Sequence, residues 1–488
     1  KILKTMNKYK ISTIGILIVI CSTVWSCKAP AVSKEIENHQ SPKLPENFTN
    51  IPNSGETQNS GLTPWKQFFT DPNLVALIDE SLKNNQELMV TLQEIEIAKN
   101  EVMYKNGKLT PTVEGKLGAG VEKVGRYTSQ GAGDASTEIE PGKEMPDPLT
   151  DFMGGITANW EVDVWKKLRN AKEASVARYL STVEGKNFVL TNLIAEVASS
   201  YYELLSLDSQ LDMVHRNIAL QKEALRIVKI QKDAARETEL AVKKFEAELL
   251  KSESEEFSIK QNMTETENRI NALLGRYPQT IKRDGSSFMN LIPQTMYAGI
   301  PSQLLSNRPD IKQAELELKA TSFDVKVAQA EFYPSVNISA TLGLQAFKPS
   351  YLIKMPESIL YSLAGEMSAP LINKSAIKAE FNTANAHQIQ ALYEYDKTIL
   401  NAYLEVTNQM SKIDNLDKSF GFKEKQAKAL SESIEIANQL FKNNRADYME
   451  VLMTQRDLIE AKQELIETKE KQLSTVVAIY KSLGGGWK

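Results

Sequence analysis

The residue types that most often carry chemistry are few in this chain and far apart. The three histidines, His39, His215 and His387, form no H-E-x-x-H motif and have no cysteine at ligand spacing, so the sequence predicts no metal site. Gly118 and Gly120 lie inside a strand pattern and not between a strand and a helix, which excludes a dinucleotide-binding loop there. A G-x-S-x-G nucleophile motif is also absent from the sequence. We therefore expect no catalytic centre and no cofactor.

Both cysteines, Cys21 and Cys27, lie close to the N-terminus. Lysines precede an apolar run over residues 11–25, and Ser26-Cys27 follows this run. This order predicts a secretory signal peptide over residues 6–26, with Met6 as the expected start. A membrane anchor helix is the alternative, but about 15 apolar residues are fewer than the roughly 20 that a bilayer span needs. The sequence VWSC at 24–27 resembles a lipoprotein signal-peptidase site, which would make Cys27 the lipidated first residue.

The charge of the chain argues against a nucleic-acid partner. The 488 residues carry a net charge of -4, and acids and bases are almost balanced, whereas phosphate binding needs a basic surface. Residues 27–61 are rich in Pro, Asn, Ser and Glu with little periodicity, which is typical of an extended tether.

Four segments have the alternation of β-strands. We expect them at about 110–128, 149–162, 334–347 and 358–371. In each segment apolar residues alternate with mostly polar ones, so one face of a sheet would be apolar and the other polar.

The longest segments have the spacing of helices. Between about 163 and 235, apolar residues recur in steps of three, four and seven, the seam of a coiled coil. About 70 helical residues at roughly 1.5 Å each form a rod on the order of 100 Å long. After the turn DAARETE at 233–239 a second helical run returns, so we expect a long helical hairpin over 163–275.

The chain contains an internal duplication. Adding 209 moves Leu274-Gly275 onto Leu483-Gly484, and adding 223 moves Pro111 onto Pro334. The order of helix, strand, strand, long helix, turn and helix also repeats. The expected domains are a first repeat at 62–275, an equatorial linker at 276–303, a second repeat at 304–484 with its hairpin at 372–484, and a tail at 485–488.

The apolar strand faces need a cover that the rest of the chain does not supply, because almost everything else is helical. A soluble core under the strands is the alternative, but no second sheet is predicted. Four strands cannot close a barrel alone, and open edges are not tolerated in lipid. Three chains with four strands each would close a barrel of twelve strands, apolar outside and polar inside, as in outer-membrane proteins.

Several motifs carry a family resemblance that covers nearly the whole mature chain. They are PWKQFFTDPNLVALIDESLKNNQEL at 64–88, WEVDVWKKLRNA at 160–171, LLSNRPDIKQAE at 304–315, VAQAEFYPSV at 327–336, RADYMEVLMTQRDLIEAKQEL at 445–465 and the final LGGGW. They resemble the TolC-like outer membrane efflux factor family, specifically its lipoprotein (NodT/OprM-like) branch. The resemblance implies a mixed α and β membrane protein: a homotrimer with a twelve-stranded outer-membrane β-barrel, continued by a long periplasmic α-helical tunnel.

The resemblance also implies a function. The chain would be a passive exit duct for drugs or other small toxic compounds, anchored in outer-membrane lipid. Its partners would be a periplasmic adaptor protein and an inner-membrane, proton-driven RND-type transporter. The alternatives are the exit duct of an ATP-driven type I protein secretion system and, from another class, a periplasmic coiled-coil scaffold without a pore.

The two hairpin turns are the sites that the resemblance implies. They would meet the adaptor through seven residues, Arg236, Glu237, Thr238, Glu239, Asn444, Arg445 and Tyr448. Asn444 stands where the family has glycine, and it accepts a left-handed conformation better than most residues. The periplasmic gate would use Glu450 and Asp447, although Met453 departs from the family's second acidic position. Three glutamates around one axis would repel each other and attract cations; the alternative is that Glu450 is a solvated acid at a helix start.

Two short motifs have local interpretations. The glycines at 275 and 484 are expected to end the returning helices in a left-handed conformation. Gly485, Gly486 and Trp487 are expected to pack against the equatorial region. NRPD at 307–310 is interpreted as a helix start and nothing more.

Overall fold

The computed structural model describes residues 36, 39, 41, 43–49, 57–370, 372, 374–443 and 445–487. These residues fall into two compact units. The sheet unit contains residues 97–179 and 316–392, and the helical unit contains residues 40–96, 180–315 and 393–488. The predicted signal peptide and the lipidation site Cys27 lie outside the described residues.

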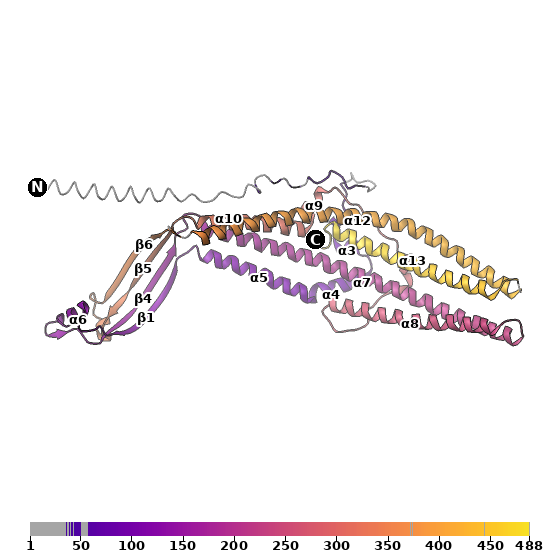
Figure 1. Ribbon diagram of the computed structural model, residues 1–488, viewed down its shortest axis with the longest axis horizontal. Coiled ribbons are helices and arrows are strands. Elements are labelled where there is room, and N and C mark those ends of the chain that lie inside the picture. Colours follow the sequence, from indigo (N-terminus) through magenta and orange to yellow (C-terminus); the bar gives the residue numbers. More distant parts are fainter. Residues whose placement is uncertain are drawn as a thin grey trace. The chain divides into compact units, whose positions relative to one another are not determined.

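The sheet unit is built on one antiparallel sheet with the strand order β1-β4-β5-β6. Its strands, which lie side by side in Figure 1, are β1 (Thr112–Glu122), β4 (Leu149–Glu161), β5 (Ser335–Ala346) and β6 (Ile359–Ser368). The register places Val113 opposite Ala158, Ala158 opposite Ala340, and Ala340 opposite Leu363. Directly opposed residues share a face, so most apolar residues of the four strands lie on one side, whereas Met153 and Leu360 lie on the other.

The connection between β1 and β4 contains structure that the sequence analysis did not anticipate. The first strand ends at Glu122, six residues before the expected end at 128, and Thr128 then caps a short helix, α6 (Ser129–Asp134). A two-stranded hairpin of β2 (Glu138–Glu140) and β3 (Lys143–Glu144) follows. The equivalent connection between β5 and β6 holds only the short helix α11 (Pro349–Leu352).

Two long helical hairpins follow the strands (Figure 1). The first consists of α7 (Lys167–Asp233) and α8 (Glu239–Leu273), and the second of α12 (Ser375–Lys442) and α13 (Tyr448–Ser482). Adding 209 to the bounds of α8 gives 448 and 482, which are the bounds of α13. The duplication in the sequence is therefore a duplication of hairpins in the structure.

Shorter helices precede each strand pair. They are the 3₁₀ helix η1 (Ser60–Leu62), α3 (Trp65–Phe68), α4 (Pro72–Asn84) and α5 (Gln86–Gly107) in the first half, and the 3₁₀ helix η2 (Gly285–Asn290), α9 (Ser302–Asn307) and α10 (Pro309–Ala330) in the second. The helical pattern after Asp71 is split because Asn85 has an extended backbone and its amide closes α4 on the Ser81 carbonyl. Its side-chain oxygen then accepts from the Leu88 amide and starts α5.

The core of the helical unit is a large apolar cluster where α4, α7, α8 and α13 meet the linker. Among its fully buried side chains are Tyr201, Leu204, Ile270 and Tyr480. The Tyr480 ring stacks on Phe68 with ring centroids 4.0 Å apart, and its hydroxyl donates to the Thr63 carbonyl at 2.6 Å. The first repeat and the end of the second therefore share one core.

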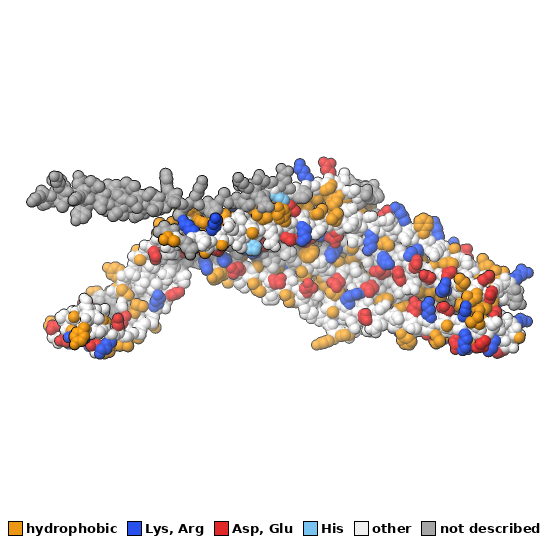
Figure 2. Space-filling view, in the orientation of Figure 1, with side chains coloured by type: hydrophobic (Ala, Val, Ile, Leu, Met, Phe, Trp, Pro, Cys, Tyr) orange, Lys and Arg blue, Asp and Glu red, His pale blue; other side chains and the backbone are white. Residues whose placement is uncertain are grey.

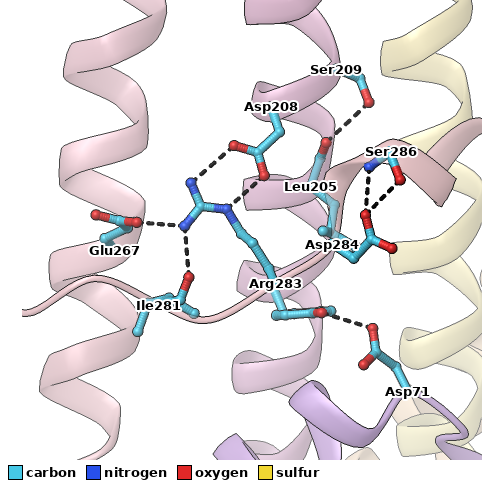
Figure 3. A network of polar contacts seen from close by, with 10 residues as sticks. Asp71, Leu205, Asp208, Ser209, Glu267, Ile281, Arg283, Asp284 and Ser286 are labelled. Carbon is cyan, nitrogen blue, oxygen red and sulfur yellow. Dashed lines mark hydrogen bonds and ion pairs between the residues drawn. The ribbon is translucent and has the colours of Figure 1, made fainter.

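The linker between the repeats is fixed to the first hairpin by one half-buried arginine (Figure 3). Arg283 donates to both carboxylate oxygens of Asp208 on α7, at 2.6 and 2.9 Å, and to Glu267 on α8 at 2.5 Å. Burial opposes the charge, but these hydrogen bonds outweigh it and raise the pKa of Arg283. The guanidinium therefore joins the linker to both helices of the first hairpin through charge-assisted hydrogen bonds.

Charged side chains of both signs are interspersed over the long helices on the face shown in Figure 2. Within the described part of the chain, none of the helices is both long enough and apolar enough to cross a membrane.

Candidate functional site

The sheet exposes an apolar face with nothing in the described chain to cover it. Leu117 on β1 is 93% exposed, and Tyr361 and Leu363 on β6 are each 79% exposed. The opposite face carries Glu114, Thr157, Thr341 and Ser362 in one cross-strand row, where the Thr157 and Thr341 hydroxyls lie 3.3 Å apart. Several large apolar side chains exposed to this extent on one face mark a contact surface, either with lipid or with another protein.

Aromatic residues border this face at the end where the helices begin. The Trp165 ring stacks on Tyr333 at 4.8 Å, and its indole N–H donates to the Pro334 carbonyl at 2.7 Å. The indole N–H of Trp160 donates to the Leu109 carbonyl at 3.1 Å. Aromatic residues with one polar partner are typical of the boundary between lipid and water.

The first hairpin turn is closed by backbone hydrogen bonds and one cap. The amides of Ala235 and Arg236 donate to the carbonyls of Lys232 and Gln231, and Ala235 has a positive φ of 52°. Thr238 is the N-cap of α8, because its hydroxyl accepts from the Ala241 amide at 3.2 Å. This is the pattern of a Schellman turn followed by a capped helix.

An ion pair crosses the same turn. Lys232 and Glu239 are 2.5 Å apart, and the hydrogen bond from Lys232 lowers the pKa of the Glu239 carboxyl. Both side chains are largely exposed, so the pair orders the turn more than it stabilises the protein.

The second turn repeats this construction. The Arg445 amide donates to the Leu440 carbonyl at 2.9 Å, the bond that Arg236 makes to Gln231 in the first turn. Asp447 is the N-cap of α13 and accepts from the Met449 amide at 3.4 Å, as Thr238 does for α8. Asn444, the residue expected to carry the left-handed conformation, lies outside the described residues.

Side chains join the two hairpins beside their turns. Lys244 on α8 lies 3.4 Å from the Met449 sulfur on α13. Further along, Gln455 on α13 donates to Asn217 on α7 at 3.2 Å, and Asn217 donates to Ser252 on α8 at 3.0 Å. Tyr448 packs against the apolar cluster inside the first hairpin. The two turns thus lie side by side.

The expected docking and gate residues are therefore found on two neighbouring turns. Arg236, Glu239, Arg445 and Glu450 are exposed, whereas Glu237 and Tyr448 are half-buried. Glu450 lies in the first turn of α13, three residues after the Asp447 cap. The exposed side chains can meet a partner, and Asp447 also has the structural task of starting α13.

Metal-ligand chemistry finds no support among the described residues, where no three His, Cys, Asp or Glu side chains could hold an ion together. His215 instead lies 3.3 Å from Glu256 across the first hairpin, and Lys260 donates to the same carboxylate.

The chain matches the family described as "Outer membrane efflux protein" over residues 77–276 and 300–485. The two matched ranges cover the two repeats and leave out most of the linker. The chain belongs to this family. The assignment confirms the resemblance stated from the motifs, and with it the predicted outer-membrane efflux channel and its location in the outer membrane.

Two curated proteins match over almost their whole length. The pyoverdine export outer membrane protein OpmQ of Pseudomonas aeruginosa is 27% identical over 436 residues, which cover 89% of this chain and 90% of that protein. The cation efflux system protein CusC of Escherichia coli is 25% identical over 431 residues, which cover 88% and 89%. This efflux family member is therefore similar to proteins whose names state different cargoes.

The fold is shared with solved outer-membrane channels. The structure of the outer-membrane channel OprN superposes with a TM-score of 0.80 at 24% identity and covers 94% of this chain and 99% of that one. The predicted fold class, four strands per chain for an outer-membrane barrel followed by a long helical tunnel, is thereby confirmed.

One residue does more than the sequence analysis expected. Arg308 in NRPD was interpreted as part of a helix start, but its guanidinium donates to Asp310, to Glu405 on α12 and to the Ser482 carbonyl at the end of α13. Burial opposes its charge, yet these partners raise the pKa of Arg308. A buried arginine needs acceptor groups around it. The arginine beside a helix start was therefore the one local signal in the sequence that could have indicated this set of contacts.

Gly485 and Trp487 pack near Arg308, against the start of α10 and the end of α13. The Trp487 indole donates to the Asn307 carbonyl at 3.2 Å, and the Lys312 ammonium lies 5.3 Å from its ring. A Cβ on Gly485 would lie 2.5 Å from the Tyr480 ring. Position 485 therefore needs glycine for close packing, and Trp487 contacts the residues at the start of α10.

Proposed function

We propose that three copies of this chain form a trimeric, passive exit duct of a tripartite efflux system for small toxic compounds. The observation that carries this proposal is the exposed apolar face of a four-stranded sheet whose edges are β1 and β6. Lipid is the environment that favours such a face, and lipid requires a closed barrel. Joining β6 of one copy to β1 of the next closes a barrel of twelve strands.

The duct works without catalysis, and its partners supply energy and selection. The exposed residues of the two turns, among them Arg236, Glu239 and Arg445, dock a periplasmic adaptor. The adaptor connects the duct to a proton-driven RND-type transporter in the inner membrane. The support for this assignment is the pair of neighbouring, similarly built turns, which offers a partner protein two closely related surfaces.

The N-terminal region anchors the duct. Residues 6–26 are removed as a signal peptide, Cys27 is lipidated, and residues 27–61 form the tether. The sequence VWSC and the apolar run before it support this assignment. Labelling with a radioactive fatty acid should be lost in Cys27→Ser, and labelling that persists would contradict the site.

Glu450 and Asp447 form the periplasmic gate. Three copies of Glu450 around one axis repel each other and attract cations, which favours cation passage through a narrow opening. The support is the exposure of both carboxylates beside the turn. The cargo of the related proteins is pyoverdine in one name and cations in the other, so the transporter and not the duct selects the compound.

Conductance in a planar lipid bilayer tests the proposal. The native protein should give ion steps with cation preference, and Glu450→Gln should reduce that preference. Glu460→Gln is the matched control, because Glu460 is exposed on the same helix ten positions further from the turn. A native protein without ion steps would favour the coiled-coil scaffold.

Crosslinking in cells identifies the partners. A photo-reactive or thiol crosslinker on Arg445→Cys should capture an adaptor that copurifies with a proton-driven transporter. An adaptor that copurifies with an ATP-driven exporter would move the protein to type I secretion.

A further inference from the structure

A short segment before η1 places one buried side chain in the core of the helical unit. In the described residues between 41 and 49, Phe48 alone is buried, at 2% exposed, whereas Lys43, Glu46, Asn47 and Thr49 are exposed. Phe48 belongs to the main apolar cluster of the helical unit. Leu44 is half-buried. A buried aromatic residue in a mostly exposed segment has the character of an anchor.

The site that receives Phe48 is on α12. The Phe48 ring stacks on Tyr403 with centroids 5.3 Å apart and an interplanar angle of 22°. The Tyr403 hydroxyl accepts a hydrogen bond from the Thr49 amide at 3.1 Å and lies 3.0 Å from the Thr49 hydroxyl. Tyr403 therefore contacts the segment through its ring and through its hydroxyl.

The chain is fixed a second time further on. The Ser60 amide donates to the Tyr297 carbonyl at 3.0 Å, and Gln303 donates to the Thr57 carbonyl at 3.0 Å. Gly61 lies against Leu483 so closely that a Cβ would be 2.6 Å from its side chain. The contacts at residues 57–63 involve the linker and the end of α13, not α12, so the Phe48 contact is a separate attachment.

We propose that the surface around Tyr403 is a docking site for the chain's own N-terminal segment and that Phe48 is the residue that occupies it. The two attachments connect the tether to both helices of the second hairpin, to α12 through Tyr403 and to α13 through residues 61 and 63. Any pull on the tether is then received first by α12.

We call the contact of Phe48 and Thr49 with Tyr403 the clamp. It also limits the length of free chain between the membrane anchor and the folded protein, and this part of the inference rests on the proposed lipidation of Cys27. Positions 27 and 48 are 21 residues apart, which corresponds to at most about 70 Å of extended chain. Without the clamp the free tether would extend to Thr57 and reach roughly 100 Å. The Phe48 contact thus shortens the free segment between the proposed lipid anchor and the folded protein.

Proteolysis of the full-length protein tests the clamp. Endoproteinase Glu-C cleaves after Glu46, and because a protease needs several extended residues on both sides of the bond, Phe48 must leave its site first. In Phe48→Ala we expect cleavage after Glu46 to be faster by about tenfold or more, since the lost burial of one phenylalanine is of that order. Tyr403→Ala should give a similar increase, and Tyr403→Phe a smaller one because only the hydroxyl contacts are lost.

Phe422→Ala is the control, because Phe422 is an exposed aromatic residue on the same helix. It should be cleaved after Glu46 at the native rate. Equal rates for Phe48→Ala and the native protein would overturn the proposal, as would equal acceleration in Phe422→Ala. Bilayer conductance of the native protein is a separate readout: its absence would overturn the proposed function and leave the cleavage comparison unaffected.

Discussion

Arg308 donates a hydrogen bond to the Ser482 carbonyl at 2.8 Å and thereby joins the start of α10 to the last turn of α13. In the first repeat, the side chain of Asn85 donates to the Leu273 carbonyl at the end of α8, at 2.9 Å. Adding 209 to 273 gives 482, so the same helix end is closed in both repeats. The repeats have the same joint but make it with different residues.

The arginine joint should be the stronger one. In Arg308→Ala the partly buried carboxylates of Asp310 and Glu405 lose a buried partner, and breaking such a pair costs about 3–5 kcal/mol. We expect faster hydrogen exchange at the amides of the last turn of α13, measured by mass spectrometry. In Asn85→Ala the cost should be closer to about 1 kcal/mol, because only neutral hydrogen bonds are lost. Equal effects at the two helix ends would contradict the argument.

Gly484 should not accept a side chain. It has a positive φ of 84°, and a Cβ would lie 2.5 Å from the Asn307 carbonyl oxygen. Gly484→Ala is expected to destabilise the protein by more than about 1 kcal/mol, through both the backbone conformation and the clash. Gly421→Ala is the control, because Gly421 is inside α12 with open space around it. There alanine should stabilise by about 0.5–1 kcal/mol. The thermal unfolding midpoints of the two variants should move in opposite directions.

Asp447 can be tested for its two roles separately. Asn is as good an N-cap as Asp, so Asp447→Asn should leave the unfolding free energy unchanged, whereas Asp447→Ala should lower it by about 0.5–2 kcal/mol. If the carboxylate also acts in the gate, both variants should lose cation preference in bilayer recordings. A loss of cation preference in Asp447→Ala alone would mean that the cap matters and the charge does not.

Glu470 on α13 should make the stability depend on pH. Burial raises the pKa of its carboxyl above the usual 4.5, although the Ser474 hydroxyl donates to it. Because the folded protein binds this proton more tightly than the unfolded chain, the group stabilises the fold below about pH 4.5, and that contribution is lost as the pH rises through the folded pKa. Glu470→Gln should therefore raise the thermal unfolding midpoint at neutral pH and change it little near pH 4.

The sequence was sufficient for the elements with strong periodicity. The alternation predicted strands at about 334–347 and 358–371, and the structure has β5 at Ser335–Ala346 and β6 at Ile359–Ser368. The end of the first strand was less well placed because Thr128, the residue that caps α6, gives only a local signal. Periodicity reports which face is buried and says little about where a ladder stops.

Long-range contacts could not be predicted in the same way. The bonds of Arg308 connect positions 97 and 174 residues away, and no local pattern specifies such partners. Phe48 lies in a segment whose composition predicts an extended tether, so its burial against Tyr403 had no periodic signal. The Asp447 cap could have been predicted from the sequence, since Asp447 and Glu450 have the spacing of a capping box.

The unequal strand connections give the loops of the proposed barrel a different symmetry from that of the hairpin turns. At the hairpin turns, each chain contributes two similarly built loops, so three chains present six nearly equivalent positions around the axis. Among the strand connections, only the one between β1 and β4 carries α6 and the β2–β3 hairpin. In the proposed trimer, the rim, defined as the set of β1–β4 and β5–β6 connections, therefore has three large loops that alternate with three small ones. A molecule that binds a single loop would saturate at six per trimer on the turn side and at three per trimer on the rim.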